Sequence, residues 1–133
     1  MIKTALDSNI ILYIHDNDDR EKQETAKSLL AQRPLVSVQV ISEYLNVMKR
    51  SFPVSKTELM DFCSEWMIGC TIHPISITTL QTAKRLIKRY DFQIFDSIIV
   101  ASALEAGCKV LYSEDMQHNL LVEKQLTIIN PFI

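Results

Sequence analysis

Four acidic residues of this 133-residue chain lie next to apolar stretches or on apolar helix faces, where unpaired acids are uncommon. Asp7 and Asp115 each follow a short apolar stretch, Asp96 begins another, and Glu43 shares a helical stripe with two valines. Acids on such faces are costly to bury, and several together repel one another unless a cation compensates them. Because neither Lys nor Arg lies within one helical turn of Glu43 or Asp96, a divalent metal ion is the simplest compensation.

The ligand types indicate which metal and which chemistry. Oxygen ligands without Cys or His select Mg²⁺ or Mn²⁺ over zinc. One or two such ions can deprotonate a water molecule, orient it in line with a phosphodiester and stabilise the charge that develops on its oxygens. This is nuclease chemistry. We expect direct or water-mediated metal ligands at Asp7, Glu43, Asp96 and Asp115, with Asn9 and Ser113 as neutral supports.

Each acid also has an explanation without chemistry. Asp7 and Asp96 could cap helices, which aspartate does well. Glu43 lies too far into its expected helix to be a cap, so its alternative is an ordinary exposed side chain. We expect Glu114, next to Asp115, to be a solvated turn residue.

The elements that must position these acids alternate between strand-like and helix-like segments. The expected strands are 2–6, 35–37, 71–75, 109–112 and 126–129. The expected helices are 20–32, 38–50, 55–67, 76 or 78 to 90, and 96–106, with Met60, Phe62 and Leu80 among the core positions. This alternation predicts parallel βαβ units in a three-layer α/β/α sandwich. Ligands bind beyond the carboxyl ends of parallel strands, where the four acids should converge.

Composition narrows the class of protein. The length fits one domain spanning residues 1–133, and 47% hydrophobic residues suffice for its core. Two glycines cannot form a dinucleotide fingerprint or a P-loop. Three cysteines without a CxxC pair indicate reduced core thiols. Without a signal peptide or an apolar run long enough to span a membrane, we expect a cytoplasmic protein.

The charge balance bears on an RNA partner. A net charge of −2 is unfavourable for binding phosphates. Setting the four site acids aside as metal-neutralised, however, leaves 12 acidic against 14 basic residues, or about +2. The residues Lys84, Arg85, Lys88 and Arg89 recur at helical spacing. They could contact RNA phosphates or form the solvated face of a helix.

Taken together, four segments resemble PIN-domain ribonucleases, specifically the VapC-type toxins of toxin–antitoxin pairs. The segments are Leu6-Asp7-Ser8-Asn9-Ile10, Ser42-Glu43-Tyr44, 95–103 and 112–118, and the resemblance covers essentially the whole chain. It implies an acidic metal site at Asp7, Glu43, Asp96 and Asp115, with Asn9, Ser113 and Ser8 as polar supports. It also implies a five-stranded parallel sheet, a homodimer, and inhibition by a VapB-type antitoxin whose C-terminal segment can place an arginine near the site.

One departure concerns the glycine that commonly follows the fourth motif. Asn119 follows His118 here, and asparagine tolerates left-handed backbone nearly as well as glycine does. The resemblance therefore predicts a Mg²⁺- or Mn²⁺-dependent endoribonuclease that leaves a 5′-phosphate and a 3′-hydroxyl.

Two rival functions remain. A phosphoryl-transfer domain of the dehalogenase or receiver type would need an aspartate where Asn9 stands, or a lysine where Asn130-Pro131 stands. A non-catalytic PIN-like module could bind RNA or protein around a structural metal. Such modules usually lose one or more acids, whereas all four are present here.

Overall fold

The computed structural model describes residues 2–133, which fold around one sheet of six strands in the order β3-β2-β1-β4-β6-β5. The strands are β1 (Thr4–Leu6), β2 (Leu35–Ser37), β3 (Thr71–His73), β4 (Val110–Tyr112), β5 (Leu121–Val122) and β6 (Leu126–Ile129). Pairings among the first four strands and β6 are parallel. The expected parallel sheet is therefore confirmed, with β1 at its centre.

The sixth strand corrects the expected count of five. β5 has only two residues and pairs antiparallel with β6 at the sheet edge. The intervening turn places Glu123 and Lys124 at φ 49° and 57°, the positive values that tight hairpin turns need at both central positions. Neither residue is a typical turn former in this conformation, so the sequence carries no clear hairpin signal.

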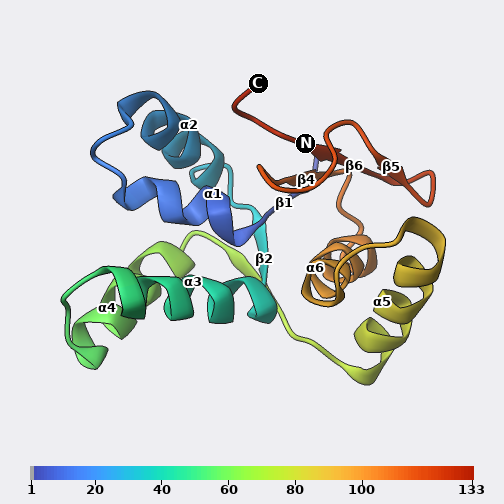
Figure 1. Cartoon of the computed structure of the whole chain (residues 1–133), viewed down its shortest axis with the longest axis horizontal. Coiled ribbons are helices and arrows are strands. Elements are labelled where there is room, and N and C mark those ends of the chain that lie inside the picture. Colours follow the sequence, from blue (N-terminus) through green and yellow to red (C-terminus); the bar gives the residue numbers. More distant parts are fainter. Residues whose placement is uncertain (1) are drawn as a thin grey trace.

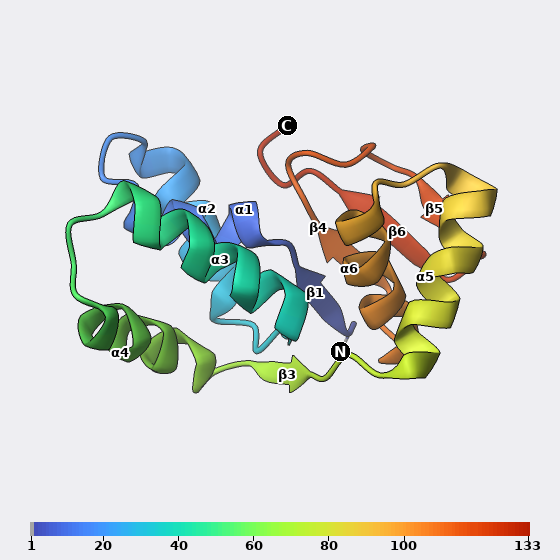
Figure 2. The same ribbon diagram turned by 60° about the horizontal axis from the view of Figure 1, so that its bottom comes forward.

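The helices are α1 (Ser8–Leu12), α2 (Arg20–Leu30), α3 (Val38–Ser51), α4 (Lys56–Met67), α5 (Ile77–Tyr90) and α6 (Ile94–Glu105), and a 3₁₀ turn, η1 (Tyr13–His15), follows α1. Figures 1 and 2 show α1–α4 gathered at one end of the molecule and α5 with α6 at the other, with β1 between the two groups. The α/β class predicted from the sequence is confirmed. None of the helices described in residues 2–133 combines the length and the hydropathy that a membrane span requires.

Serine and aspartate caps begin most of the longer helices. The side chains of Ser37, Ser55 and Ser76 each accept a hydrogen bond from the backbone N–H three residues later. The helix start expected at Asp96 is wrong, because α6 begins two residues earlier, after Gln93, and the alternative role of Asp96 as an N-cap falls with it. Asp96 instead lies in the first turn of α6, where its side chain is free to take part in a site.

The core draws on every layer of the fold, and α6 contributes its longest continuous buried segment. Residues 98–103 of α6 are buried all round. Three expected core positions are wrong: Met60, Phe62 and Leu80 are 53%, 36% and 49% exposed. In α4 the buried stripe is Leu59, Cys63 and Trp66, which leaves no room on the inner face for the other two side chains. In α5 the stripe includes Ala83 and Leu86.

The backbone at Asn119 and the state of the three cysteines test two smaller expectations. Asn119 adopts φ 68°, which confirms that asparagine serves where the resemblance would place glycine. The three cysteines are free; Cys63 and Cys108 are buried, whereas Cys70 is only partly so.

Candidate active site

Asp7 lies at the centre of the site, directly after β1. Its backbone N–H donates to the carbonyl of Tyr112 across the β1–β4 pairing (2.9 Å), and its side chain is the N-cap of α1. The carboxylate accepts hydrogen bonds from the Ser8 N–H (2.7 Å) and the Ser113 Oγ (2.7 Å). Only 3% of the residue is exposed, so these donors replace the water that a surface carboxylate would have.

Ser113 joins Asp7 to the loop that carries Asp115. It follows β4 and is fully buried. Besides donating to Asp7, its Oγ accepts from the backbone N–H groups of Asp115 and Met116 (3.3 Å each). One hydroxyl group therefore connects the segment after β1 with the segment after β4.

Asn9 makes a second connection between the same two segments. Its Nδ2 donates to Asp115 Oδ2 (3.1 Å) and to Asp7 Oδ2 (3.4 Å), and its Oδ1 accepts from the Glu114 N–H (3.2 Å). The sequence singled out Asn9 and Ser113 as neutral supports. In the structure Asn9 bonds both carboxylates, whereas Ser113 bonds the Asp7 carboxylate and the backbone N–H of Asp115.

Glu43 approaches from α3 and is held by two neutral donors. Ser8 Oγ donates to its Oε1 (3.0 Å), and Gln39 Nε2 donates to its Oε2 (2.9 Å). Gln39 was not among the expected site residues. Its signal in the sequence was its position one helical turn before Glu43, the spacing at which two helical side chains meet.

Asp96 reaches the same region from the first turn of α6 and is partly buried. Within residues 2–133, its side chain makes no hydrogen bond. Burial raises the pKa of Asp96, and repulsion by Glu43 and Asp115 adds to the effect. Burial likewise raises the pKa of Asp7 to about 6; hydrogen bonds from Ser113 and Ser8 oppose the rise, whereas Asp96 and Glu43 add to it. The four acids therefore act on one another electrostatically.

The donor set fits a hard divalent cation in its chemistry. All four charged groups are carboxylates, and the raised pKa values of two of them indicate uncompensated negative charge that a cation would relieve. The side-chain placement in residues 2–133 does not, however, form a group of three or more His, Cys, Asp or Glu that could hold a metal ion. The structure thus gathers the expected ligands at one edge without closing them around a single point.

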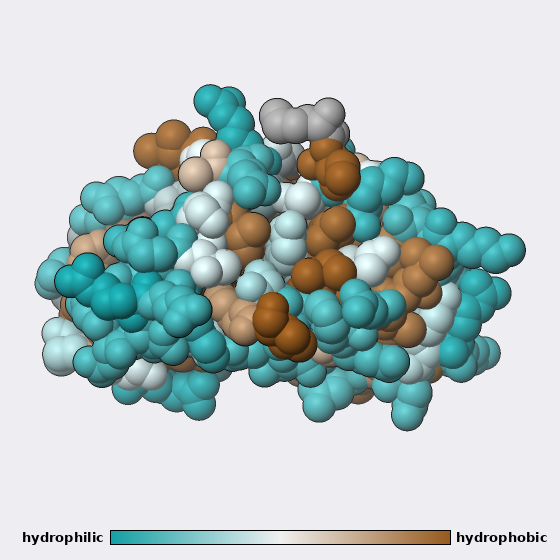
Figure 3. Space-filling view, turned by 90° about the horizontal axis from the view of Figure 1, so that it is seen from above, coloured by the Kyte–Doolittle hydropathy of each residue, from teal (hydrophilic) through white to brown (hydrophobic). Residues whose placement is uncertain are grey.

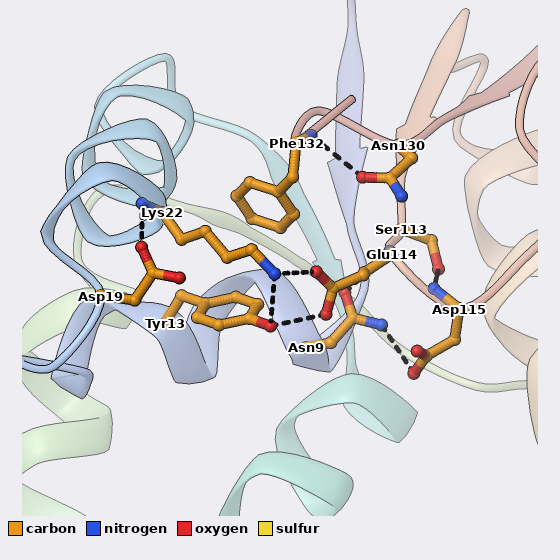
Figure 4. A network of polar contacts seen from close by, with 9 residues as sticks. All are labelled: Asn9, Tyr13, Asp19, Lys22, Ser113, Glu114, Asp115, Asn130 and Phe132. Carbon is orange, nitrogen blue, oxygen red and sulfur yellow. Dashed lines mark hydrogen bonds and ion pairs between the residues drawn. The ribbon is translucent and has the colours of Figure 1, made fainter.

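Glu114 does not behave as the solvated turn residue expected from the sequence. Its carboxylate accepts from Tyr13 Oη (2.6 Å) and Lys22 Nζ (2.7 Å), as Figure 4 shows. The sequence gave no sign of this contact, because Lys22 lies on a separate helix, 92 residues earlier in the chain.

The four basic residues of α5 divide into two pairs. Arg85 donates to both oxygens of Glu123 (2.9 and 2.8 Å), and Arg89 to one of them (3.2 Å). These arginines therefore attach α5 to the β5–β6 turn. Lys84 and Lys88 are exposed.

The architecture is thus a mostly parallel α/β fold with acidic and amide side chains at the carboxyl ends of β1 and β4. The family model of the PIN domain matches residues 4–121. The chain therefore belongs to the PIN-domain family. A comparison of the sequence with curated proteins found no match.

Solved structures share the fold at low sequence identity. A toxin–antitoxin complex from Klebsiella pneumoniae contains a chain that is 17% identical, with a TM-score of 0.71 over 97% of this chain and 97% of that one. VapBC2 from Rickettsia felis, bound to promoter DNA, gives 16% identity and a TM-score of 0.70 over 98% and 100% of the two chains. VapC20 from Mycobacterium tuberculosis, described as a toxin that cleaves the sarcin–ricin loop, gives 15% and 0.66 over 82% and 87%.

Proposed function

We propose that this protein is a Mg²⁺- or Mn²⁺-dependent endoribonuclease and the toxin of a VapBC-type toxin–antitoxin pair. The observation that carries the proposal is the hydrogen-bonded connection of Asp7 with Asp115 through Ser113 and Asn9, next to Glu43 and Asp96. Membership of the PIN-domain family supports a nuclease. The shared fold of toxins from toxin–antitoxin complexes supports the more specific role.

The site residues would have two roles in hydrolysis: holding the metal and fixing the residues that hold it. Asp7, Glu43, Asp96 and Asp115 would hold the metal. When bound, the metal supplies Lewis acidity, which lowers the pKa of a water molecule and neutralises charge on the phosphodiester. Ser113 and Asn9 fix the first and last of these acids, while Ser8 and Gln39 orient Glu43. Such preset donors lower the cost of reorganisation during reaction.

Exposed basic and apolar residues would bind RNA and a protein partner. Lys84 and Lys88 are exposed and could pair with RNA phosphates, whereas Arg85 and Arg89 already pair with Glu123. Ile94 and Phe95, 67% and 61% exposed, stand directly before Asp96. Figure 3 shows apolar surface near the middle of one face. Apolar surface of this kind is typical of protein contacts, which supports an antitoxin and a second copy of the chain as partners.

The test is end-mapped cleavage of total RNA by the purified protein with Mn²⁺ or Mg²⁺. We expect discrete cuts that leave 5′-phosphates and that vanish on adding a chelator and in Asp96→Asn. The asparagine variant should keep its fold, because Asp96 makes no hydrogen bond within residues 2–133. Equal cleavage by this variant at equal purity would refute the assignment of the site.

The alternative is a binding module with a structural metal. It predicts that Mn²⁺ raises the melting temperature without any turnover of RNA. The antitoxin role has its own test: a small protein encoded next to this chain should copurify with it and abolish cleavage.

A further inference from the structure

We propose that Lys22, Tyr13 and Glu114 form a clamp that positions Asp115 in the site. The inference rests on the proposed function, since it concerns how one of the proposed metal ligands is held. The clamp is composed of residues outside the four acids and their direct supports, and it joins η1 and α2 to the segment after β4.

The contacts of Glu114 use both of its carboxylate oxygens. Tyr13 Oη donates to Oε1 (2.6 Å), and Lys22 Nζ donates to Oε2 (2.7 Å) and also to Tyr13 Oη (3.2 Å). A carboxylate held at both oxygens cannot rotate freely, so its backbone is held as well. Ion pairs of this kind are among the stronger hydrogen bonds.

Lys22 is itself held in place. Its backbone N–H donates to the Asp19 side chain, which caps α2 (3.1 Å). Its ammonium group lies 4.9 Å from the centre of the Tyr13 ring and 5.2 Å from that of Phe132. The two rings meet edge to face at 5.0 Å. Figure 4 shows the Tyr13 and Phe132 rings on either side of the Lys22 side chain, next to Glu114. The two charged side chains are only 33% and 25% exposed.

The clamp acts on Asp115 through the backbone. Figure 4 shows Glu114 directed toward Tyr13 and Lys22, whereas Asp115 is directed toward Asn9. The Glu114 N–H donates to Asn9 Oδ1, and Asn9 Nδ2 donates to Asp115. Asp115 is otherwise exposed, so its carboxylate depends on these contacts for a fixed position. Residues that orient a metal ligand typically change metal affinity by about 10–100-fold when they are replaced.

The experiment compares Lys22→Met, Lys22→Arg and the matched control Lys3→Met in the full-length protein. Lys3 also donates a long-range hydrogen bond, to the Ala106 carbonyl (2.6 Å), but it precedes β1, at the opposite end of that strand from Asp7. Two quantities are measured: backbone amide exchange at Asp115 and Met116 by NMR, and Mn²⁺ affinity without RNA by water-proton relaxation.

We expect Lys22→Met to speed exchange at these two amides selectively and to weaken Mn²⁺ binding by about 10-fold. Lys22→Arg should retain both properties in large part, and Lys3→Met should change neither. Unchanged exchange, or exchange raised equally throughout the protein, would overturn the clamp. Faster exchange with unchanged Mn²⁺ affinity would overturn its role in positioning Asp115.

The two proposals can fail separately. If the wild-type protein neither binds Mn²⁺ nor cleaves RNA, the proposed function fails, and the exchange data still decide whether the clamp orders the loop. If Lys22→Met does not fold, Tyr13→Phe provides the same test, because it removes one donor to Glu114 and keeps the ring that packs against Phe132.

Discussion

Replacing Asp7 by asparagine should stabilise the metal-free protein at neutral pH. Burial raises the pKa of Asp7 from 3.8 to about 6, so the folded state binds its proton more tightly than the unfolded state does. Above pH 6 the carboxylate is charged in both states, and this difference of about two pKa units costs the folded state about 3 kcal/mol. Asparagine carries no charge and avoids this cost.

The expected gain is smaller than this cost and depends on pH. Asparagine keeps an acceptor for the Ser8 N–H but loses part of the hydrogen bonding to Asn9 and Ser113, at about 1 kcal/mol. The net stabilisation at pH 7.5 is therefore about 2 kcal/mol. As the pH falls from 6 toward 3.8, the wild-type carboxylate becomes protonated in the folded state first, and the advantage of the variant disappears.

Urea unfolding at pH 7.5 and pH 4.5, with a chelator present, measures this difference. Asp18→Asn, which changes an exposed aspartate, is the control and should have little effect at either pH. Mn²⁺ at 100 times its dissociation constant should add about 2.7 kcal/mol to the wild type and much less to Asp7→Asn. If Asp7→Asn is less stable than the wild type by the same amount at both pH values, the argument from the buried charge is wrong.

Three further outcomes are expected. Leu86→Ala removes a fully buried side chain from α5 and should lower the unfolding free energy by about 2–5 kcal/mol in urea; a loss below 1 kcal/mol would contradict the packing described. Lys84→Glu with Lys88→Glu should weaken RNA binding and reduce the slope of log K against log salt concentration by about 1.4. Filter binding at several salt concentrations measures this slope, and parallel lines for the variant and the wild type would contradict the prediction. Burial lowers the pKa of His15 below its usual 6.5, so its neutral folded form favours folding above pH 6.5 and this stability is lost as the pH falls below that value. His15→Asn should therefore lose less thermal stability than the wild type between pH 7 and pH 5, and circular dichroism melts that shift in parallel would refute this.

Local pattern accounts for most of the fold. Apolar runs mark the five parallel strands, and the Ser55 cap with its periodic apolar residues marks α4. The start of α6 was misplaced because apolar Ile94 and Phe95 lie exposed on its first turn, so the beginning of the buried run does not coincide with that of the helix. β5 was missed because two residues are too few for a period to show.

In the candidate site, too, local contacts could be predicted from the sequence and long-range contacts could not. The direct neighbours of the acids could be expected from the sequence, since Ser8 and Asn9 stand within two residues of Asp7. The contacts of Glu114 could not be expected, because they join residues 92 and 101 positions apart whose meeting depends on how α2 and η1 pack beside β4. A charged residue next to a proposed ligand looks the same in a sequence whether it is solvated or enclosed.

The pairing of β1 with β4 determines when a newly made chain can complete its candidate site. Asn9 and Asp115 are hydrogen-bonded although they lie 106 positions apart. During translation, Asp7 and Asn9 are therefore made long before Asp115, and the site cannot form until Asp115 has been added. At about 5–20 residues per second, this wait lasts roughly 5 to 20 seconds. During that interval the ribosome carries a nascent chain that cannot assemble its acidic edge. The acidic edge of this PIN domain can therefore form only after the 106 residues that follow Asn9, as far as Asp115, have been made.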